Sequence, residues 1–355
     1  MKILFLSPYP LGKAPSQRLK YEQYYAIIEA EGYEITTSSF VSEKFWSVIY
    51  KRGNYVKKIG HTLHGYSRRI KDLFRLRKYD IVYIHLWATP FGFPLFEWVI
   101  RKLSKKIIYD IDDLIYLNNE SNNNGIISVF KGRKKPFFLM SSAEHVIVCT
   151  PMLQAVALKY NSNVTDISST IDTEAYRPKS TYSIQKKTVL GWSGSHSTSK
   201  YLHLLQNVLV QLNEELEFKL LVIGDENFNI EGIEIEAIAW SKEAEIKELS
   251  RIDIGLYPLP DEPWVYGKSG LKALQYMALG IPTIASAIGA NFRIINHGNS
   301  GFLVSTRDEW LSKIKRLMND EGLRCSIGKE GRQVVEKNYS IKVNAQKYLD
   351  ILKSV

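Results

Sequence analysis

The sequence predicts an α/β protein built from two Rossmann-like domains, and three features support this prediction. First, the apolar run at residues 2–7 is followed by a helical pattern and by an alternating strand at 33–39. Second, the same alternation of strands and helices starts again at 188–192, after a polar stretch. Third, 355 residues are enough for two domains of ordinary size. We therefore predict a first domain, a linker, a second domain and a last helix, at residues 1–178, 179–187, 188–338 and 339–355.

Composition favours a protein that works inside the cell without crossing a membrane. Hydrophobic residues make up 45% of the chain, and no run of eighteen apolar residues occurs. The opening stretch MKILFLSPYP is too short for a signal peptide, so we interpret it as a first strand. Cys149 and Cys325 lie far apart in the sequence, as expected of two reduced thiols in a cytosolic protein. We therefore expect a cytoplasmic location.

Positive charge is concentrated in one block of the chain. Between Ser42 and Lys106 there are fifteen Lys or Arg and four Asp or Glu, a net charge of +11 against +10 for the whole chain. Aromatic residues lie among these cations, a combination that suits an anionic membrane surface or a lipid-linked phosphate. Alternatively, these cations simply form the solvent-exposed face of one or more helices and bind no partner. We do not expect nucleic acid as a partner, because no recognition motif accompanies the charge.

The segment 261–286 predicts a loop, a short helix, a turn and a buried strand. Lys268, Ser269 and Gly270 stand where the helix should begin, and Gly280 followed by Pro282 marks its end. The start of a helix offers unpaired N–H groups and a positive dipole end, which suit a phosphate. On this segment alone, an ordinary loop–helix–strand unit explains the pattern equally well.

Polar residues follow several predicted strands, where ligands of Rossmann-like sheets bind. Ser16 and Arg18 are placed to meet an anion at the start of the first helix, and His85 ends another strand. A third strand runs into Asp110, Asp112 and Asp113, ahead of a polar loop predicted at 118–125. Such acids can hold a divalent metal on a sugar diphosphate, as in the GT-A fold, or they can simply cap the next helix.

The central segment resembles the signature of retaining GT-B glycosyltransferases of family four. Six positions fall in register with that signature: Gly270, Leu271, Met277, Ala278, Gly280 and Pro282. The stretch containing Asp172, Tyr176 and Pro178 resembles the element that closes the first domain in this family. The resemblance implies a GT-B fold, with two Rossmann-like domains facing across a cleft and a C-terminal helix crossing back to the N-terminal domain. It also implies a donor held by the second domain, an acceptor held by the first, no metal and no cofactor.

The resemblance assigns residues to roles and also reveals departures. The expected Arg is replaced by Trp192 and Ser193, so we expect Lys268 to supply the missing charge beside the diphosphate. Gln275 stands where a ribose-binding Glu is usual, and Gly267 replaces a Glu that contacts the transferred sugar. The implied catalytic residues are Asp112, Asp113 and Lys268. The implied donor-binding residues are Gly194, Ser195, His196, Lys200, Lys268, Ser269, Gly270, Leu271 and Gln275. On the acceptor or phosphate side we expect Ser16, Arg18 and His85.

The function implied is a retaining, metal-independent transfer of a sugar from a nucleoside-diphosphate sugar to a glycan or lipid-linked acceptor. Bacterial surface polysaccharide synthesis is the expected setting, with possible attachment to the inner face of the cytoplasmic membrane. The leading alternative is a non-catalytic GT-B-like subunit that binds a nucleotide-sugar or a partner, because Gly267 lacks the usual side chain. A GT-B-like epimerase or phosphorylase is a third class.

Overall fold

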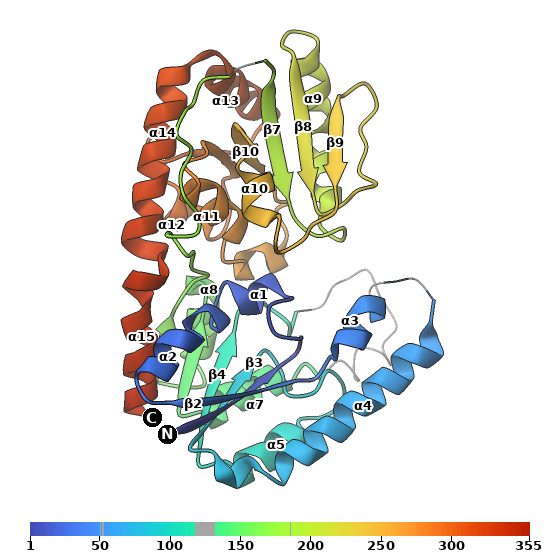
Figure 1. Cartoon of the computed structure of the whole chain (residues 1–355), viewed down its shortest axis with the longest axis vertical. Helices are drawn as coiled ribbons and strands as arrows, with labels where there is room; N and C mark the ends of the chain where they lie inside the picture. The colour runs from blue at the N-terminus through green and yellow to red at the C-terminus, as the bar shows by residue number, and fades with distance from the viewer. Residues whose placement is uncertain (50, 52, 118–131, 185) are drawn as a thin grey trace. The chain divides into compact units, whose positions relative to one another are not determined.

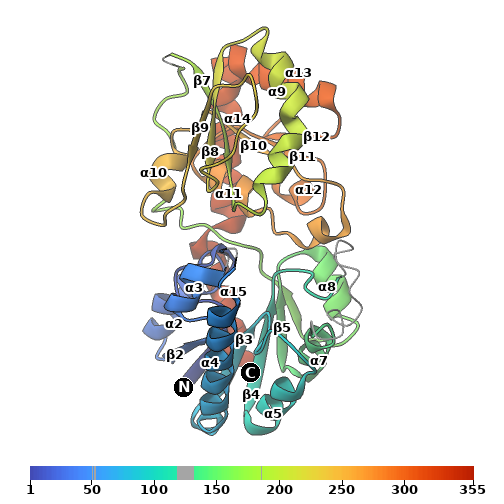
Figure 2. The same ribbon diagram turned by 90° about the vertical axis from the view of Figure 1, so that its right-hand side faces the viewer.

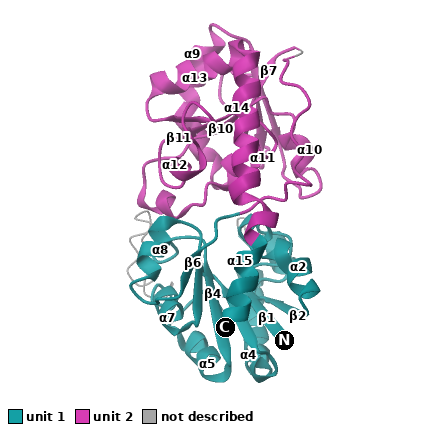
Figure 3. Ribbon diagram, turned by 90° about the vertical axis from the view of Figure 1, so that its left-hand side faces the viewer, with its two compact units in different colours: residues 1–169, 345–355 teal, residues 170–344 magenta. Residues whose placement is uncertain are grey.

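The protein is described here by a computed structural model of residues 1–49, 51, 53–117, 132–184 and 186–355. It divides into two compact units, coloured separately in Figure 3. Unit 1 comprises Met1–Ser169 and Ala345–Val355, and unit 2 comprises Thr170–Asn344. The polar loop predicted at 118–125 lies outside the described residues. No helix in the described ranges is long and apolar enough to cross a membrane.

The observed division places the end of the first unit earlier than residue 178. Residues 170–178 belong to unit 2 because their hydrogen bonds are made there. The amide of Ile171 donates to the carbonyl of Tyr339 at 2.8 Å. The hydroxyl of Tyr176 donates to Glu245 at 2.9 Å. The stretch that we assigned to the closing of the first domain is thus the first segment of the second.

Unit 1 contains a six-stranded parallel sheet in the order β2-β1-β3-β4-β5-β6. The strands span Lys2–Ser7 (β1), Glu34–Ser39 (β2), Ile81–His85 (β3), Lys106–Ile111 (β4), His145–Val148 (β5) and Val164–Asp166 (β6). The chain builds β2 on one side of β1 and β3 to β6 on the other. The carboxyl ends of β1 and β3 therefore form the point where the order reverses, which is where ligands of such sheets bind.

Helices cover both faces of this sheet (Figure 1). Their bounds are Pro15–Arg18 (α1), Tyr25–Ala30 (α2), Glu43–Ile49 (α3), Tyr55–Leu73 (α4), Leu95–Leu103 (α5), Lys135–Ser142 (α7) and Pro151–Ala157 (α8), with 3-10 turns at Glu22–Tyr24 (η1) and Leu76–Lys78 (η2). Much of the positively charged block identified from the sequence lies in α4 and η2. The first predicted helix is instead broken into α1, η1 and α2. A helix at Ile341–Ser354 (α15) starts in unit 2 and ends in unit 1.

Alternate residues of the strands fill the two cores of unit 1. Leu4, Val82 and Ile107 pack in one buried cluster with side chains of α5 and α7. On the other face, Phe5 and Tyr83 meet α2 and α15, where the rings of Tyr24 and Tyr348 lie 4.5 Å apart. These strands are apolar on both faces, as parallel strands covered by helices require.

Unit 2 repeats this plan with a second parallel sheet, ordered β12-β11-β10-β7-β8-β9. The strands span Thr188–Ser193 (β7), Phe218–Ile223 (β8), Ile235–Ile238 (β9), Ile254–Tyr257 (β10), Thr283–Ser286 (β11) and Phe302–Val304 (β12). The helices span Gln206–Asn213 (α9), Glu245–Leu249 (α10), Leu271–Ala278 (α11), Asn291–Ile294 (α12), Arg307–Asn319 (α13) and Glu321–Val334 (α14). Two 3-10 helices lie at Ser199–Leu205 (η3) and Pro263–Gly267 (η4), and a short π-helix lies at Val335–Tyr339 (η5).

The helices of unit 2 again lie on both faces of their sheet, and α9 and α10 are seen on opposite sides in Figure 2. α9 and α13 pack with Leu190, Leu220 and Ile254 in one cluster. α10 and α11 pack with Leu221 and Ile223 in the other. Two parallel six-stranded sheets exclude the GT-A alternative and agree with the two-domain prediction.

Candidate functional site

In unit 2 the strand order reverses between β7 and β10, and the segments that follow these two strands carry the predicted donor residues. The chain leaves β7 through Ser193 and Gly194, and it leaves β10 through the loop that leads to η4 and α11. Loops at the carboxyl ends of a parallel sheet meet at this reversal point. Fold topology alone therefore brings the turn at Gly194 beside the start of α11.

The turn at Gly194 has no room for a side chain. A Cβ on Gly194 would lie 2.4 Å from the ring of Trp192 and 2.9 Å from Cε of Lys272. The neighbouring turn is equally tight, because a Cβ on Gly224 would lie 1.8 Å from the carbonyl oxygen of Gly194. The glycines thus let two strand ends and one lysine side chain come together within van der Waals contact.

Lys272 is the residue that the sequence analysis missed at this site. It lies in the first turn of α11, and its ammonium lies 4.9 Å from the ring centroid of Trp192 and 5.6 Å from that of Tyr257. Within the described residues, its ammonium has no carboxylate partner. A signal was available, since Lys272 is the only charged residue between Lys268 and Arg293. A lone cation in so apolar a stretch indicates a purpose other than solubility.

The electrostatics of Lys272 favour an anion in this space. Burial, followed by repulsion from Lys268, lowers the pKa of Lys272 from 10.5 to about 8. An ammonium held in such a place without a counter-charge is disfavoured, and a bound anion removes the penalty. The aromatic faces of Trp192 and Tyr257 compensate only in part, since a cation–π contact contributes roughly 0.5–2 kcal/mol.

The start of α11 adds backbone donors to the same place. Gly270 precedes the helix with φ 74°, and no side chain caps the helix. A Cβ on Gly270 would lie 2.3 Å from Cδ1 of Ile294, so glycine is required by both conformation and space. The first amides of a helix have no partner within it, so those from Leu271 onward are available to an anion.

The two lysines predicted from the sequence lie at the border of this site. Lys268 is the residue after η4 rather than the start of α11, and its ammonium lies 5.6 Å from the ring centroid of Trp264. Lys200 is exposed and lies over the ring of Tyr201 at 5.1 Å. The rings of Tyr201 and Trp264 are 5.2 Å apart, so one aromatic pair connects the two cations. Lys268 lies close enough to Lys272 for its charge to lower the pKa of Lys272.

The turn after Gly194 is held by its own hydroxyl groups. The Ser195 hydroxyl hydrogen-bonds those of Ser197 and Thr198, at 2.9 and 3.2 Å. His196 is exposed but contacts the buried carboxylate of Asp225 through Nδ1 at 3.0 Å. Burial opposes ionisation of Asp225, yet hydrogen bonds from Ser199 and His196 lower its pKa. The charged carboxylate of Asp225 thus holds the turn in place through its contacts with His196 and Ser199.

Gln275 is more enclosed than the ribose-binding role in the sequence prediction suggests. Its side chain is buried, and its amide nitrogen donates to the Tyr176 hydroxyl at 2.9 Å. That hydroxyl donates to Glu245, which also accepts from the indole of Trp240 at 2.9 Å. Gln275 is thus oriented by a chain of buried hydrogen bonds. Gly267, the position without the usual Glu, is the buried last residue of η4.

Unit 1 carries a second group of predicted residues at the carboxyl ends of β3 and β4. Here Asp110 is fully buried and forms an ion pair with Lys20, which is also fully buried. The hydroxyl of Tyr83 donates a further hydrogen bond to Asp110. Burial opposes ionisation of Asp110, but Lys20 and His85 together outweigh burial and lower the pKa of Asp110. The Asp110 carboxylate is therefore already occupied by Lys20 and Tyr83 within unit 1.

The structure brings His85 and Asp112 together from neighbouring strands. Nε2 of His85 lies 3.6 Å from Oδ1 of Asp112, and Nδ1 lies 3.8 Å from Asp110. Both ring nitrogens and this Asp112 oxygen are buried without a hydrogen-bond partner among the described residues. Burial raises the pKa of Asp112, and the charges of His85 and Lys20 offset this only in part. A carboxylate with a raised pKa beside an imidazole suits binding or deprotonation of a hydroxyl.

The remaining predicted site residues of unit 1 are Asp113, Ser16 and Arg18. Asp113 accepts from the amide of the next residue, Leu114, at 2.8 Å. Ser16 and Arg18 are half-buried in α1, a helix of only four residues. Among the described residues, no group of three or more His, Cys, Asp or Glu is arranged to hold a metal. Asp110 belongs to the Lys20 ion pair, which counts against the Asp110–Asp112 metal site considered from the sequence.

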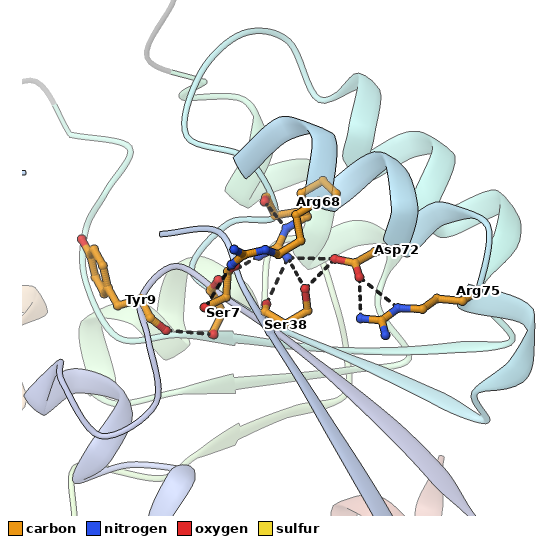
Figure 4. A network of polar contacts seen from close by, with 9 residues as sticks. Ser7, Tyr9, Ser38, Arg68, Asp72 and Arg75 are labelled. Carbon is orange, nitrogen blue, oxygen red and sulfur yellow. Dashed lines mark hydrogen bonds and ion pairs between the residues drawn. The ribbon is translucent and has the colours of Figure 1, made fainter. Parts of the chain in front are cut away.

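A recess of about 400 Å³ opens at the carboxyl ends of β1 and β2. It is lined by hydroxyl groups, by the acids Glu22 and Glu43, and by two arginines, Arg68 of α4 and Arg75 just beyond the end of that helix. Figure 4 shows how the wall is fixed: Asp72 accepts two hydrogen bonds from Arg75, at 3.0 and 2.6 Å, and one from Ser38 at 2.7 Å. The Arg68 guanidinium donates to the backbone of Ser39 at 2.5 Å. Such a lining of hydroxyl and guanidinium groups suits a polar, hydroxylated ligand.

Comparison with known proteins agrees with this geometry. The family model described as glycosyl transferases group 1 matches residues 187–320. Residues 187–320 are a group 1 glycosyltransferase domain. The capsular polysaccharide biosynthesis glycosyltransferase CapM of Staphylococcus aureus is 25% identical over 166 residues, which is 44% of this chain and 43% of CapM. The matched stretches span from 21% to 56% of the lengths of the first curated relatives.

Solved structures extend the likeness over the whole chain. HepE from Anabaena, in complex with UDP and glucose, has a TM-score of 0.72 at 16% identity and covers 100% of both chains. Sucrose-phosphate synthase from Thermosynechococcus elongatus has a TM-score of 0.71 at 14% identity, covering 100% of this chain and 99% of that one. The group 1 domain is thus part of a GT-B fold, as the resemblance implied.

Proposed function

We propose that this group 1 protein is a retaining glycosyltransferase that uses a nucleoside-diphosphate sugar without a metal ion. The observation that supports it best is Lys272, a half-buried cation with no carboxylate partner in the described chain, at the reversal point of the sheet in unit 2. The leaving group of such a transfer is a diphosphate whose negative charge grows in the transition state. A fixed ammonium and helix N–H groups stabilise that charge without a metal.

In this mechanism Lys272 contacts the diphosphate, with Lys268 as a second cation and the amides following Gly270 as hydrogen-bond donors. The turn at Gly194 and Ser195 supplies further donors. Gln275, oriented by Tyr176, faces the ribose. Asp112 and His85 bind or deprotonate the acceptor hydroxyl. These roles deepen the donor assignment made from the sequence and add Lys272 to it.

We infer that the acceptor is a glycan or a lipid-linked sugar, and that the reaction belongs to bacterial surface polysaccharide synthesis. The name of the relative CapM supports this setting. The hydroxyl-lined recess of unit 1 is a suitable place for the acceptor. The expected location is the inner face of the cytoplasmic membrane.

The decisive experiment measures donor binding and turnover on the full chain. HepE was solved with UDP and with UDP-glucose, so UDP-sugars are tested first, followed by GDP- and ADP-sugars. A binding donor raises the melting temperature by mass action. Turnover should persist in EDTA, and NMR of the product should show the anomeric configuration of the donor. Loss in EDTA that Mg²⁺ or Mn²⁺ restores would overturn metal independence, and an inverted anomer would overturn retention.

The second candidate function is a non-catalytic subunit that binds a nucleotide-sugar. Gly267 motivates it, because this position gives the sugar no side chain. Donor binding with neither transfer nor hydrolysis, across a panel of acceptors, would favour this candidate. Replacing Gly267 with Glu then becomes the matched test, since gained turnover would identify the missing group.

A further inference from the structure

The surface of α4 in unit 1 differs from that of an ordinary amphipathic helix. One side is buried and includes Gly65, Arg69 and Asp72. At 100° per residue, an apolar row lies almost opposite that buried side. The members of this row, with the exposed fraction of each, are Val56 (84%), Ile59 (60%), Leu63 (64%), Ile70 (46%) and Phe74 (85%). The row runs for about 27 Å at the helical rise. A solvated helix would place polar residues there.

A second apolar group lies beside this row. Tyr66 connects the two, since its hydroxyl donates to the carbonyl of Phe91 at 3.2 Å and its ring lies 5.6 Å from that of Phe96. The exposed side chains of this group come from α5 and the segment before it, and they are Phe91, Phe93, Leu95 and Trp98. Figure 1 shows α4 and α5 as neighbours. We call these nine side chains the α4–α5 face.

Cations border the α4–α5 face, and exposed carboxylates are missing from it. Lys57 and Lys71 are exposed on α4, and the ammonium of Lys102 lies 5.9 Å from the ring centroid of Trp98. Between residues 44 and 79 the sequence has a single acid, Asp72, which is buried and paired with Arg69 and Arg75. The only acid from 81 to 109 is Glu97, which is buried too.

We propose that the α4–α5 face inserts its apolar row into an anionic lipid surface while the bordering lysines contact the headgroups. A helix with a basic border and exposed aliphatic and aromatic residues is suited to lie in the plane of a membrane interface. Charge complementarity excludes a second copy as the better occupant, because pairing two such faces would bring lysines together without carboxylates to neutralise them. This inference gives the proposed membrane location a surface and a mode of binding, and does not require transferase activity.

The test is co-sedimentation of the full chain with vesicles of phosphatidylcholine, with and without phosphatidylglycerol. Ile59→Ser with Leu63→Ser should weaken binding to anionic vesicles on the order of tenfold. Lys57→Glu with Lys71→Glu should weaken it at low salt, and this difference should shrink as salt rises. The control is Leu204→Ser with Val210→Ser on η3 and α9, whose side chains are 51% and 39% exposed. That pair should bind like the wild type.

Two results would overturn the inference. One is equal binding of the wild type and the Ile59/Leu63 variant to anionic vesicles. The other is a dimer, found by sedimentation equilibrium without vesicles, that the same variant converts to monomer, since the face would then belong to a second copy. Melting temperatures of all variants verify folding. Because donor is absent throughout, failure here is separate from failure of the proposed transfer reaction.

Discussion

Two lysines of this protein, one fully buried and one half-buried, have opposite electrostatic environments. Lys20 in unit 1 forms an ion pair with buried Asp110. Burial lowers the pKa of Lys20, but Asp110 and the other acidic groups nearby together outweigh burial and raise it. Lys272 in unit 2 has aromatic rings but no carboxylate beside it in the described chain, and burial lowers its pKa to about 8. The first charge is neutralised when the chain folds. The second is left for a ligand to neutralise, which is why we associate it with function.

The largest expected effect comes from removing the partner of Lys20. Asp110→Asn leaves a fully buried ammonium without its counter-charge, so the free energy of unfolding should fall by about 3–5 kcal/mol. Urea unfolding followed by circular dichroism measures it. Lys272→Met is the matched control and should leave stability unchanged or raise it. A larger loss of stability in Lys272→Met than in Asp110→Asn would reverse the comparison.

The next effect is functional. Lys272→Met removes a charge-assisted contact worth roughly 1.5–3 kcal/mol, so the transfer rate should fall on the order of 10- to 100-fold. Calorimetric affinity should fall for the nucleoside diphosphate and stay the same for the nucleoside.

Two lysines at the border of the site serve as controls for this substitution. Lys268→Met should cost less than Lys272→Met, and exposed Lys200→Met least. If Lys268→Met removed most of the diphosphate affinity while Lys272→Met had no effect, the diphosphate contact would belong to Lys268.

A smaller effect should appear with pH. The folded pKa of Lys272, about 8, lies below its ordinary 10.5, so its ammonium is lost as pH rises through 8. Diphosphate affinity should then weaken by up to about tenfold per pH unit above 8. Lys272→Arg should remove this dependence, because arginine stays charged. Between pH 8 and 10.5 the unfolded chain binds more protons at this site, so the ligand-free protein should gain stability as pH rises. A flat affinity profile from pH 7 to 10 would contradict the assignment.

The smallest effect contrasts two carboxylates of unit 1. Burial raises the pKa of Asp112, so its charged form is unfavourable in the folded state, unlike that of Asp110. Asp112→Asn should therefore change the free energy of unfolding at pH 7 by less than about 1 kcal/mol. The two Asn variants are compared in the same urea titration. If both variants lost the same free energy of unfolding, both carboxylates would serve stability alone.

Much of the fold followed from strand patterns that need no tertiary information. The apolar runs at 2–7, 106–111 and 218–223 are strands, because parallel strands covered on both faces are apolar throughout. The short strands β6 and β12 were not predicted. β6 is only half-buried and contains Thr165 and Asp166, so its pattern is not that of a core strand.

The sites were harder to predict, because burial and pairing depend on tertiary contacts. Three acids do follow one another at the end of a strand, as the sequence indicated. The sequence did not indicate that one of them, Asp110, pairs with Lys20, ninety positions earlier in the chain. Lys268 was noticed because it precedes the helix, whereas Lys272 lies inside an apolar helix and was not singled out. Only the glycine turn at 194 and the ring of Trp192 show that its side chain reaches the strand ends. Whether these residues bind donor stays a prediction.

The division of α15 between the units also has a consequence for biosynthesis. Unit 2 is one continuous segment, whereas unit 1 needs residues from both ends of the chain. Tyr348, Ile351 and Leu352 line the same small apolar space as Phe5 and Tyr83. On the ribosome, the early sheet of unit 1 must wait for this last helix, while the later-made unit 2 can already be complete. The nascent chain therefore exposes an unfilled apolar face until α15 has been made, and a chaperone can bind this face in that interval.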